Sequence, residues 1–332
     1  MINERIDEFT FLSKIGEGGM ATVYKAFDNN FKEHVAIKVL KSEFVNHKNV
    51  RARFIAEARK LYKLSHKNII KVRRIIDAGD VVAFVMELVS GATLKEYVEQ
   101  NAPLKHNKVE EVFKEMLSAL SFVHSMGFVH RDVKPSNFMI TLDGRLLLLD
   151  FGIAKDVDGN SDYTATGTNY QMGTPSYMSP EQIRNSKGVD QRSDIYSLGV
   201  VLFFMVNGKG PYEASNMSLF DLFTKIVNEP IPKSSAVWDD IIQKMTEKTL
   251  ENRYSDCSEI PSKIKLSNRI INDKKHIREM LINFLFSQLS LGILILIVVI
   301  LFSSIPNHLL VFAFPVVLIF STIYLGFYFG RK

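Results

Sequence analysis

The chain of 332 residues has a single cysteine, Cys257, and no amino-terminal export signal. One cysteine excludes an intramolecular disulfide and fits a reducing compartment, so we interpret Cys257 as a packing residue. The opening residues, MINERIDEFTF, lack the basic stretch and apolar core of a secretory signal peptide. We therefore expect the soluble part of the chain to stay in the cytoplasm.

Long runs of one charge are also missing. The formal net charge of +5 comes from 41 basic and 36 acidic residues, which are interspersed over the soluble part. No long basic stripe with interleaved aromatic residues is present, so we expect no nucleic-acid partner. Charged residues make up 23% and hydrophobic residues 46% of the chain, a composition that excludes a largely disordered protein.

Short runs rich in β-branched and aromatic residues fill the first 90 residues. The runs FTFLSKIG, ATVYKAFD and EHVAIKVL predict three antiparallel strands, and KVRRIIDAGD and VVAFVMEL predict two more. A helical period interrupts them at about residues 49–65 and dominates after residue 93. We therefore predict an α+β chain in which a small β-rich lobe precedes a larger helical lobe.

Several glycines lie between the first two predicted strands, in the run IGEGGMATVY from Ile15 to Tyr24. Glycines let a backbone turn closely over a polyphosphate and expose N–H groups to it. A dinucleotide-binding loop needs a helix directly after its glycines, whereas a strand follows here. Taken alone the run favours a glycine-rich hairpin, so a phosphate-binding role depends on further motifs.

Two charged residues in the first lobe are placed to form a pair. The run VAIK ends at Lys38, and Glu57 lies on the helix that is predicted to follow. A buried ammonium needs an opposite charge, and phosphate oxygens, to offset its desolvation. We therefore expect an ion pair between these two side chains.

Two more specific motifs follow in the second lobe, HRDVKPSN beginning at His130 and DFG beginning at Asp150. Phosphoryl transfer needs a carboxylate that orients the attacking hydroxyl and accepts its proton, and Asp132 suits that task. It also needs oxygen ligands for Mg²⁺, a cation that prefers hard oxygen donors. Asn137 and Asp150 suit this second task.

With these motifs in this order, the chain resembles a eukaryotic-type (Hanks-type) protein kinase. GEGGMATVY and GTPSYMSPEQ are most similar to the bacterial Ser/Thr kinases. The resemblance covers about residues 8–267 and implies a bilobal fold, with an N-lobe over residues 1–90 and a C-lobe over residues 91–267. It also implies a non-specific serine/threonine protein kinase that uses ATP and Mg²⁺, with Mn²⁺ as an alternative, and acts on protein substrates.

The resemblance assigns roles position by position. Lys38 resembles the lysine that holds the α- and β-phosphates, with Glu57 as its partner. Asp132 resembles the catalytic base, and Asn137 and Asp150 resemble the metal ligands. The residues expected around ATP are Ile15, Gly16, Gly18, Gly19, Val23, Ala36, Lys38, Met86, Glu87, Val89 and Met139.

Four positions concern recognition of the base and of the acceptor. Met86 resembles the gatekeeper, and Glu87 and Val89 would offer backbone groups to adenine. Lys134 resembles the lysine of Ser/Thr kinases that contacts the transferring phosphate, and tyrosine kinases differ there. The sequence therefore favours Ser and Thr over Tyr as acceptors.

The long segment of residues 156–172 has no period and is rich in Gly, Thr, Ser and Asn, which is typical of a functional loop. Arg131 resembles the arginine that pairs with a phosphate on such an activation segment through charge-assisted bonds. We expect autophosphorylation at one or more of Thr164, Thr166 and Thr168. After the segment, Gly173 and Thr174 precede SPE, and Thr174 is expected to contact the catalytic loop.

Three charged residues resemble structural positions of the family. Glu181, in SPE, is expected to pair with Arg253, and Asp194 is expected to hold the backbone of the catalytic loop. Direct roles in the chemistry are not expected for these residues.

Two apolar stretches without a formal charge end the chain, at residues 281–302 and 309–329. Each is long enough for a membrane-spanning helix, and the short polar break between them predicts a two-helix hairpin. A basic linker, residues 268–280, precedes the pair. The positive-inside rule places both termini in the cytoplasm of a multi-pass membrane protein. The flanking basic residues are Lys274, Lys275, Arg278, Arg331 and Lys332.

Other interpretations remain. A buried helical hairpin would normally carry a polar face, which these stretches lack. A pseudokinase scaffold is disfavoured by the intact charged residues of the motifs, and small-molecule kinases lack the segment between DFG and SPE. The sequence leaves a homodimer open and does not identify the substrates.

Overall fold

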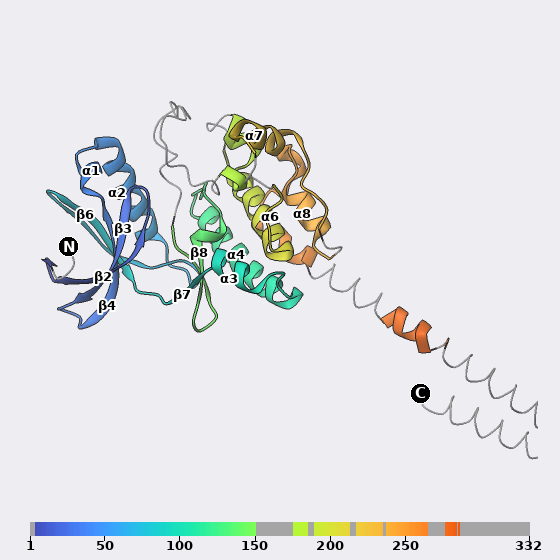
Figure 1. Ribbon diagram of the computed structural model, residues 1–332, viewed down its shortest axis with the longest axis horizontal. Coiled ribbons are helices and arrows are strands. Elements are labelled where there is room, and N and C mark those ends of the chain that lie inside the picture. Colours follow the sequence, from blue (N-terminus) through green and yellow to red (C-terminus); the bar gives the residue numbers. More distant parts are fainter. Residues whose placement is uncertain are drawn as a thin grey trace, which may run out of the picture. The chain divides into compact units, whose positions relative to one another are not determined.

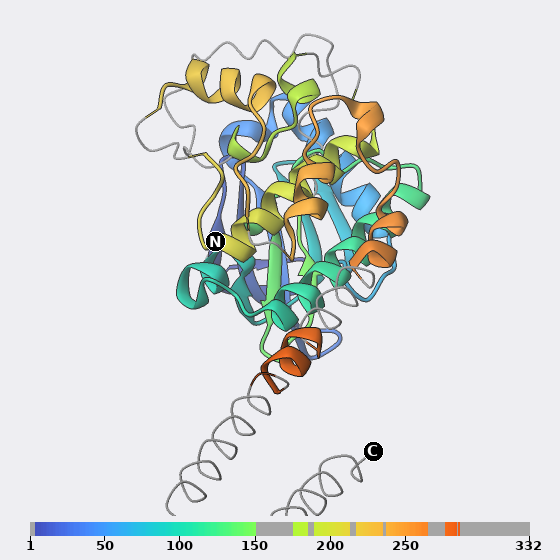
Figure 2. The same ribbon diagram turned by 90° about the vertical axis from the view of Figure 1, so that its right-hand side faces the viewer.

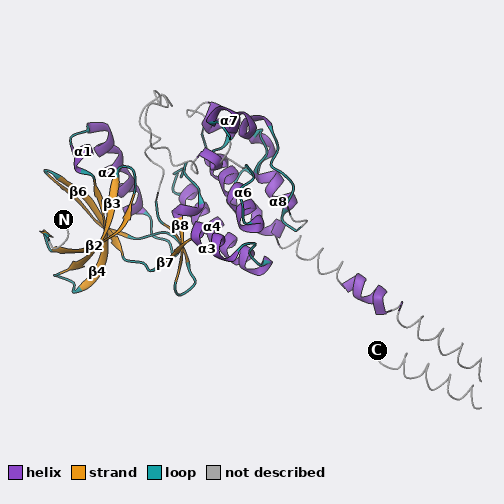
Figure 3. Cartoon of the chain, in the orientation of Figure 1, coloured by secondary structure: helices purple, strands orange, loops and turns teal. Residues whose placement is uncertain are grey.

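The computed structural model describes residues 4–150, 175–184, 189–212, 217–234, 237–264, 276–283 and 285. The chain divides into two compact units, Met1–Leu266 and Ser267–Lys332. The first unit contains a lobe of strands and a lobe of helices, shown in Figure 1 and coloured by secondary structure in Figure 3. Figure 2 shows the same unit with the helices of the second lobe toward the viewer.

A six-stranded antiparallel sheet forms most of the N-lobe, in the order β1-β2-β3-β4-β6-β5. The five strands predicted from the sequence are confirmed, with ends that differ by at most two residues, and β1 is an additional short strand. The strands are β1 (Arg5–Ile6), β2 (Phe9–Glu17), β3 (Ala21–Asp28), β4 (Glu33–Leu40), β5 (Val72–Ala78) and β6 (Val81–Glu87).

The alternation of β4 decides which side chains face the active site. Val35, Ile37 and Val39 join a small apolar cluster with residues of β2, β5 and β6. Because successive side chains of a strand point to opposite faces, Lys38 points to the other face of the sheet. The alternating pattern of VAIKV thus places the lysine on the side where the following helix packs.

Two helices, α1 (Ser42–Val45) and α2 (Lys48–Lys63), follow β4. Along α2 the buried residues recur at helical spacing, and they include Phe54, Glu57 and Leu61. The ring of Phe54 lies 5.2 Å from that of Phe84 on β6, which fixes the helix on the sheet. The same spacing turns the Glu57 carboxylate inward.

The C-lobe is mainly helical. Its helices are α3 (Leu94–Asn101), α4 (His106–Ser125), α5 (Pro180–Arg184), α6 (Gln191–Asn207), α7 (Leu219–Asn228) and α8 (Asp239–Met245). Helix α6 is buried without interruption from Ser193 to Met205 and forms the centre of the lobe. The buried Cys257 belongs to this core, as expected for a packing residue.

The sequence prediction differs from the structure at several places in this lobe. The run WDDIIQKMTEKTL, residues 238–250, reads as one helix in the sequence, but α8 ends at Met245. Beyond that end, the Glu247 carbonyl accepts a bond from Arg253 Nε (2.6 Å) instead of continuing the helix. Helices α5 and α7 were not predicted, nor was a small antiparallel sheet. Its strands are β7 (Gly91–Thr93), β8 (Phe138–Thr141) and β9 (Leu146–Leu148).

Close packing between α6 and α8 depends on Gly199. A Cβ atom there would lie 2.7 Å from Thr246 Cγ2 and 2.8 Å from Met245 Cβ. We expect Gly199→Ala to lower the free energy of unfolding by about 1–2 kcal/mol, because overpacking outweighs a gain in helix propensity of about 1 kcal/mol. Urea unfolding measures the change. Gly19→Ala is the control, since its Cβ would meet nothing within 4 Å; equal midpoints for the two variants would contradict the expectation.

In the second unit, a helix at residues 276–283 is described. Its apolar side chains are largely exposed, among them Ile277, Met280 and Leu281. Among the described residues, no helix combines the length and apolar character needed to cross a membrane. The predicted spans at residues 281–302 and 309–329 lie outside the described residues, apart from the first few of the former.

Candidate active site

A cavity of about 250 Å³ lies between the lobes, with mainly apolar walls. All the residues predicted around ATP line it except Gly18, Gly19 and Lys38. A flat, apolar base fits such walls, and polar backbone at the edge can orient it. The residues lining the cavity are Ile15, Gly16, Val23, Ala36, Ile70, Met86, Glu87, Leu88, Val89, Thr93, Met139, Leu149 and Asp150.

The glycines of the first motif form the turn between β2 and β3. Gly18 donates its N–H to the Ala21 carbonyl (2.8 Å), which closes the turn. Gly18 and Gly19 are both exposed, and a Cβ at Gly19 would meet nothing within 4 Å. The backbone of this turn is therefore open for a ligand that carries phosphates.

Lys38 joins the two lobes through an ion triad. Its Nζ lies 2.9 Å from Glu57 Oε1 on α2 and 2.8 Å from Asp150 Oδ1, so the predicted pair with Glu57 is confirmed. Burial lowers the pKa of Lys38, but the carboxylates of Asp150 and Glu57 outweigh burial and raise that pKa above its ordinary value. The lysine therefore stays positively charged, as a group that binds phosphate must.

The carboxylate of Asp132 is held by two neighbours of its own loop. Lys134 Nζ lies 2.7 Å from Asp132 Oδ2, and Asn137 Nδ2 donates to the same oxygen (3.1 Å) and to the Asp132 carbonyl (2.8 Å). His130 is fully buried, and burial lowers its pKa, so the neutral ring accepts the Asp132 N–H at Nδ1 (3.2 Å). This loop presents one oriented carboxylate beside a cation.

Asp194 supports the same loop from α6. Its carboxylate accepts the N–H groups of His130 (2.7 Å) and Arg131 (2.8 Å) and contacts His124 Nε2 (2.8 Å). Arg131 has a φ of 63°, a left-handed conformation that is strained for an arginine. Gln182 Nε2 donates to the Arg131 carbonyl (2.9 Å) from the other side. The predicted support of the loop by Asp194 is confirmed.

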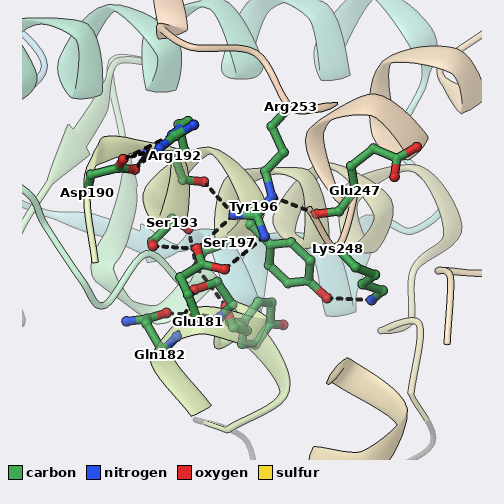
Figure 4. Close-up of polar contacts among 12 residues, drawn as sticks. Glu181, Gln182, Asp190, Arg192, Ser193, Tyr196, Ser197, Glu247, Lys248 and Arg253 are labelled. Atoms are coloured by element: carbon green, nitrogen blue, oxygen red, sulfur yellow. Dashed lines mark hydrogen bonds and ion pairs between the residues drawn. The ribbon is translucent and has the colours of Figure 1, made fainter. Parts of the chain in front are cut away.

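Glu181 and Arg253 form a bidentate ion pair, as predicted. Arg253 Nη1 and Nη2 lie 2.7 and 2.8 Å from the two carboxylate oxygens, and Ser193 Oγ donates to one of them (Figure 4). Burial would raise the pKa of Glu181, but Arg253 lowers it below its ordinary value. The pair holds α5 against the segment that follows α8 and contains Arg253.

Comparison with known proteins identifies the fold family. The model of the protein kinase domain matches residues 9–264. The chain belongs to the protein kinase family. It is 37% identical over 270 residues to the probable serine/threonine-protein kinase PknB of Lactococcus lactis, a match that covers 80% of this chain and 42% of the relative.

Two further similarities agree with this kinase assignment. The chain is 36% identical over 274 residues to the serine/threonine-protein kinase PrkC of Bacillus subtilis, covering 80% and 41% of the two proteins. This chain thus spans about two fifths of the length of the curated relatives it matches. The crystal structure of the Mycobacterium tuberculosis PknI kinase domain matches in fold, with a TM-score of 0.63, 24% identity and coverage of 81% and 98%.

A kinase domain implies ATP and a divalent metal ion, and the residues present fit both. Asn137 uses its Nδ2 for the bonds to Asp132, which leaves its Oδ1 for a cation. Asp150 offers a second carboxylate oxygen beyond the one bonded to Lys38. In the described part of the chain, no cluster of three or more His, Cys, Asp or Glu could hold a metal alone. A cation here would be bound by Asn137, Asp150 and oxygens of the phosphates together.

Some predicted residues of the kinase domain lie outside the described residues. They are Gly152, the activation-segment residues Thr164, Thr166 and Thr168, and the pair Gly173 and Thr174.

The sequence reasoning also missed residues that the fold brings to the kinase site. Leu149 lines the cavity and was not predicted, although its position directly before Asp150 is a usable signal. Gln182 contacts the catalytic loop from a residue 51 positions away, and nothing in its local sequence indicates that contact.

Proposed function

We propose that the chain is a serine/threonine protein kinase that transfers the γ-phosphate of ATP to protein hydroxyls. The observation that carries the proposal is the Lys38–Glu57–Asp150 triad, of which Asp150 lines the cavity. It would place a cation and a metal-binding carboxylate near the phosphates of a bound nucleotide. A scaffold that only bound partners would have no need of this arrangement.

We infer a separate role in the transfer for each of these residues. Mg²⁺, held by Asn137 and Asp150, would neutralise charge on the phosphates. Asp132 would orient the attacking hydroxyl and accept its proton, and it is positioned by the bonds from Asn137. Lys134, 2.7 Å from Asp132, would stabilise charge on the group in transfer. The apolar walls around Met86 would hold the base, with backbone at Glu87 and Val89 as its polar edge.

Phosphate transfer from labelled ATP to a generic protein substrate tests this function. We expect Mg²⁺-dependent label on Ser or Thr from the full chain, its removal by EDTA, and a loss of about 10²-fold or more in Lys38→Met, which lacks the charge that holds the phosphates. Label on tyrosine alone would contradict the acceptor class. Absence of label, with ATP still bound, would favour the scaffold.

We further propose that the enzyme is regulated by autophosphorylation of its activation segment at Thr164, Thr166 or Thr168. Two cations near the catalytic loop support this. Burial and the nearby Arg131 guanidinium lower the pKa of Lys60 on α2, so two cations lie near each other next to Asp132. A phosphate on the segment would form charge-assisted bonds with cations of this kind. Phosphopeptide mapping of residues 156–172 in the full chain and in Lys38→Met tests it; identical maps would oppose the proposal.

We also propose that residues 281–302 and 309–329 anchor the kinase domain to the cell membrane as a hairpin with both termini in the cytoplasm. Support comes from two charge-free stretches of about 20 residues and from the basic residues on their outer sides. Because Cys257 is buried, a cysteine placed at Ser303 can be labelled selectively. An impermeant maleimide should label Ser303→Cys in intact cells and label Lys332→Cys only after permeabilisation; the reverse pattern would overturn the topology.

A further inference from the structure

Lys248 carries a half-buried ammonium in the C-lobe without a carboxylate partner. Its Nζ donates to the Ile226 carbonyl (2.8 Å) and the Tyr196 hydroxyl (3.1 Å), with Tyr212 OH at 3.5 Å. No carboxylate of the described residues lies within ion-pair distance of it. A cation in this position is costly unless it makes interactions that require its charge.

A second cation, Arg253, lies beside the same tyrosine. The Tyr196 ring stands 5.2 Å from the Lys248 ammonium and 4.9 Å from the Arg253 guanidinium, as Figure 4 shows. Burial and the charge of Arg253 lower the pKa of Lys248 to about 8, against the weaker opposite pull of Glu247 and Glu229. The lysine is therefore connected, through one ring, to the Glu181–Arg253 pair that holds α5.

The acceptor of the shortest of these bonds is the carboxyl end of α7. The last carbonyls of a helix lack partners within the helix, and cations are stabilised beside them. In α7 the Ile226 carbonyl binds Lys248, and the Val227 carbonyl receives Arg184 Nη2 of α5 (3.4 Å). Two cations from two neighbouring elements thus fix this end of α7.

Helix α5, which packs against α7, also contacts the catalytic loop. It follows the activation segment, and its Gln182 Nε2 donates to the Arg131 carbonyl next to Asp132. Ser197 Oγ of α6 binds the Tyr177 carbonyl just before α5 (2.7 Å). Residues 175–184 therefore lie beside the loop that carries Asp132, and α7 packs against this segment.

We propose that Lys248 is a positioning residue for the protein substrate. Its ammonium holds the end of α7 against α5 and α6, and so sets the surface on which the substrate lies. Lys248 touches neither ATP nor the reacting atoms. The proposal rests on the proposed kinase activity, and it predicts that the charge at this position affects protein binding and not nucleotide binding.

Steady-state kinetics of the full chain with myelin basic protein as the probe substrate test the proposal. For Lys248→Met we expect the KM for the protein to rise about 5–10-fold, a loss of the size expected for one charge-assisted hydrogen bond. The KM for ATP and kcat should stay within about twofold. Lys248→Arg should restore the protein KM, because a guanidinium can also donate to the Ile226 carbonyl. Lys263→Met, an exposed lysine elsewhere in the lobe, is the matched control.

The pH dependence gives a second readout. The groups facing Lys248 are Tyr196, Tyr212, Arg253, Arg184, Glu229 and Glu247. Burial raises the pKa values of both tyrosines and lowers that of Lys248 to about 8, so between pH 7 and 9 the lysine loses its charge while the tyrosines stay neutral. The protein KM of the wild type should rise through about pH 8, and that of Lys248→Arg should remain flat.

Three outcomes would overturn the proposal. The first is an unchanged protein KM in Lys248→Met. The second is a parallel change in the KM for ATP and in the unfolding midpoint, which would mean a purely structural role. Hydrogen exchange supplies the third, which does not depend on activity: amides of residues 219–228 must exchange faster in Lys248→Met than in wild type, and unchanged exchange refutes the contact. A wild type without any transferase activity would instead count against the proposed function.

Discussion

Asp132→Asn is expected to lower kcat by about 10²–10⁴-fold while ATP binding stays within about twofold, because general-base catalysis contributes a factor of that size. The carboxylate is oriented by Lys134 (2.7 Å) and Asn137 (3.1 Å), both of which donate to it. Both donors bind the same oxygen, Asp132 Oδ2, and an amide of the same shape keeps an oxygen that can accept these bonds. The amide cannot, however, take the proton of the attacking hydroxyl. The loss should therefore appear in turnover rather than in binding.

Single-turnover transfer from labelled ATP, together with a separate titration of ATP binding, separates the two effects. Asp143→Asn is the matched control, since Asp143 is an exposed carboxylate in the turn between β8 and β9 that pairs with Arg145 (2.7 Å). That variant should transfer phosphate at the wild-type rate. Equal rates for the two variants would exclude Asp132 as the base and would move the search to another carboxylate near the cavity.

Local features of this fold could be predicted from the sequence because their causes are local. The alternation in VAIKV determines which face Lys38 occupies, and helical spacing determines that Glu57 turns inward. The two side chains meet because a short connection joins their elements. For the same reason, the strands of the N-lobe were predicted almost to the residue.

Contacts between distant segments had no such local cause. Gln182 reaches Arg131, and Lys248 reaches the end of α7, only because α6 brings their elements together. The strands β7 and β8 are short and pair across a separation of nearly 50 residues, so no run of β-formers reveals them. A motif indicated the Glu181–Arg253 pair, whereas the Tyr196 ring beside it became visible only in three dimensions.

Asp194→Ala is expected to lower the free energy of unfolding by about 3–5 kcal/mol, because it leaves buried donors without an acceptor at about 1–3 kcal/mol each. Asp194 is 1% exposed and accepts the N–H groups of His130 and Arg131, in addition to its contact with His124. Without the carboxylate, nothing on α6 offsets the left-handed backbone of Arg131, whose strain costs a further amount of order 1–3 kcal/mol. Urea unfolding of the full chain measures the loss.

Activity should fall further than the unfolded fraction explains. If the Arg131 backbone relaxes, Asp132 moves with it, and a displacement of about 1 Å can cost about 10²-fold in rate. Asp194→Asn keeps one acceptor oxygen and should lie between wild type and Asp194→Ala in both stability and kcat. Measurements at a temperature where all three proteins are folded separate geometry from unfolding. A fully stable but inactive Asp194→Ala would instead assign the residue to the chemistry, and a stable and active one would mean that Gln182 alone holds the loop.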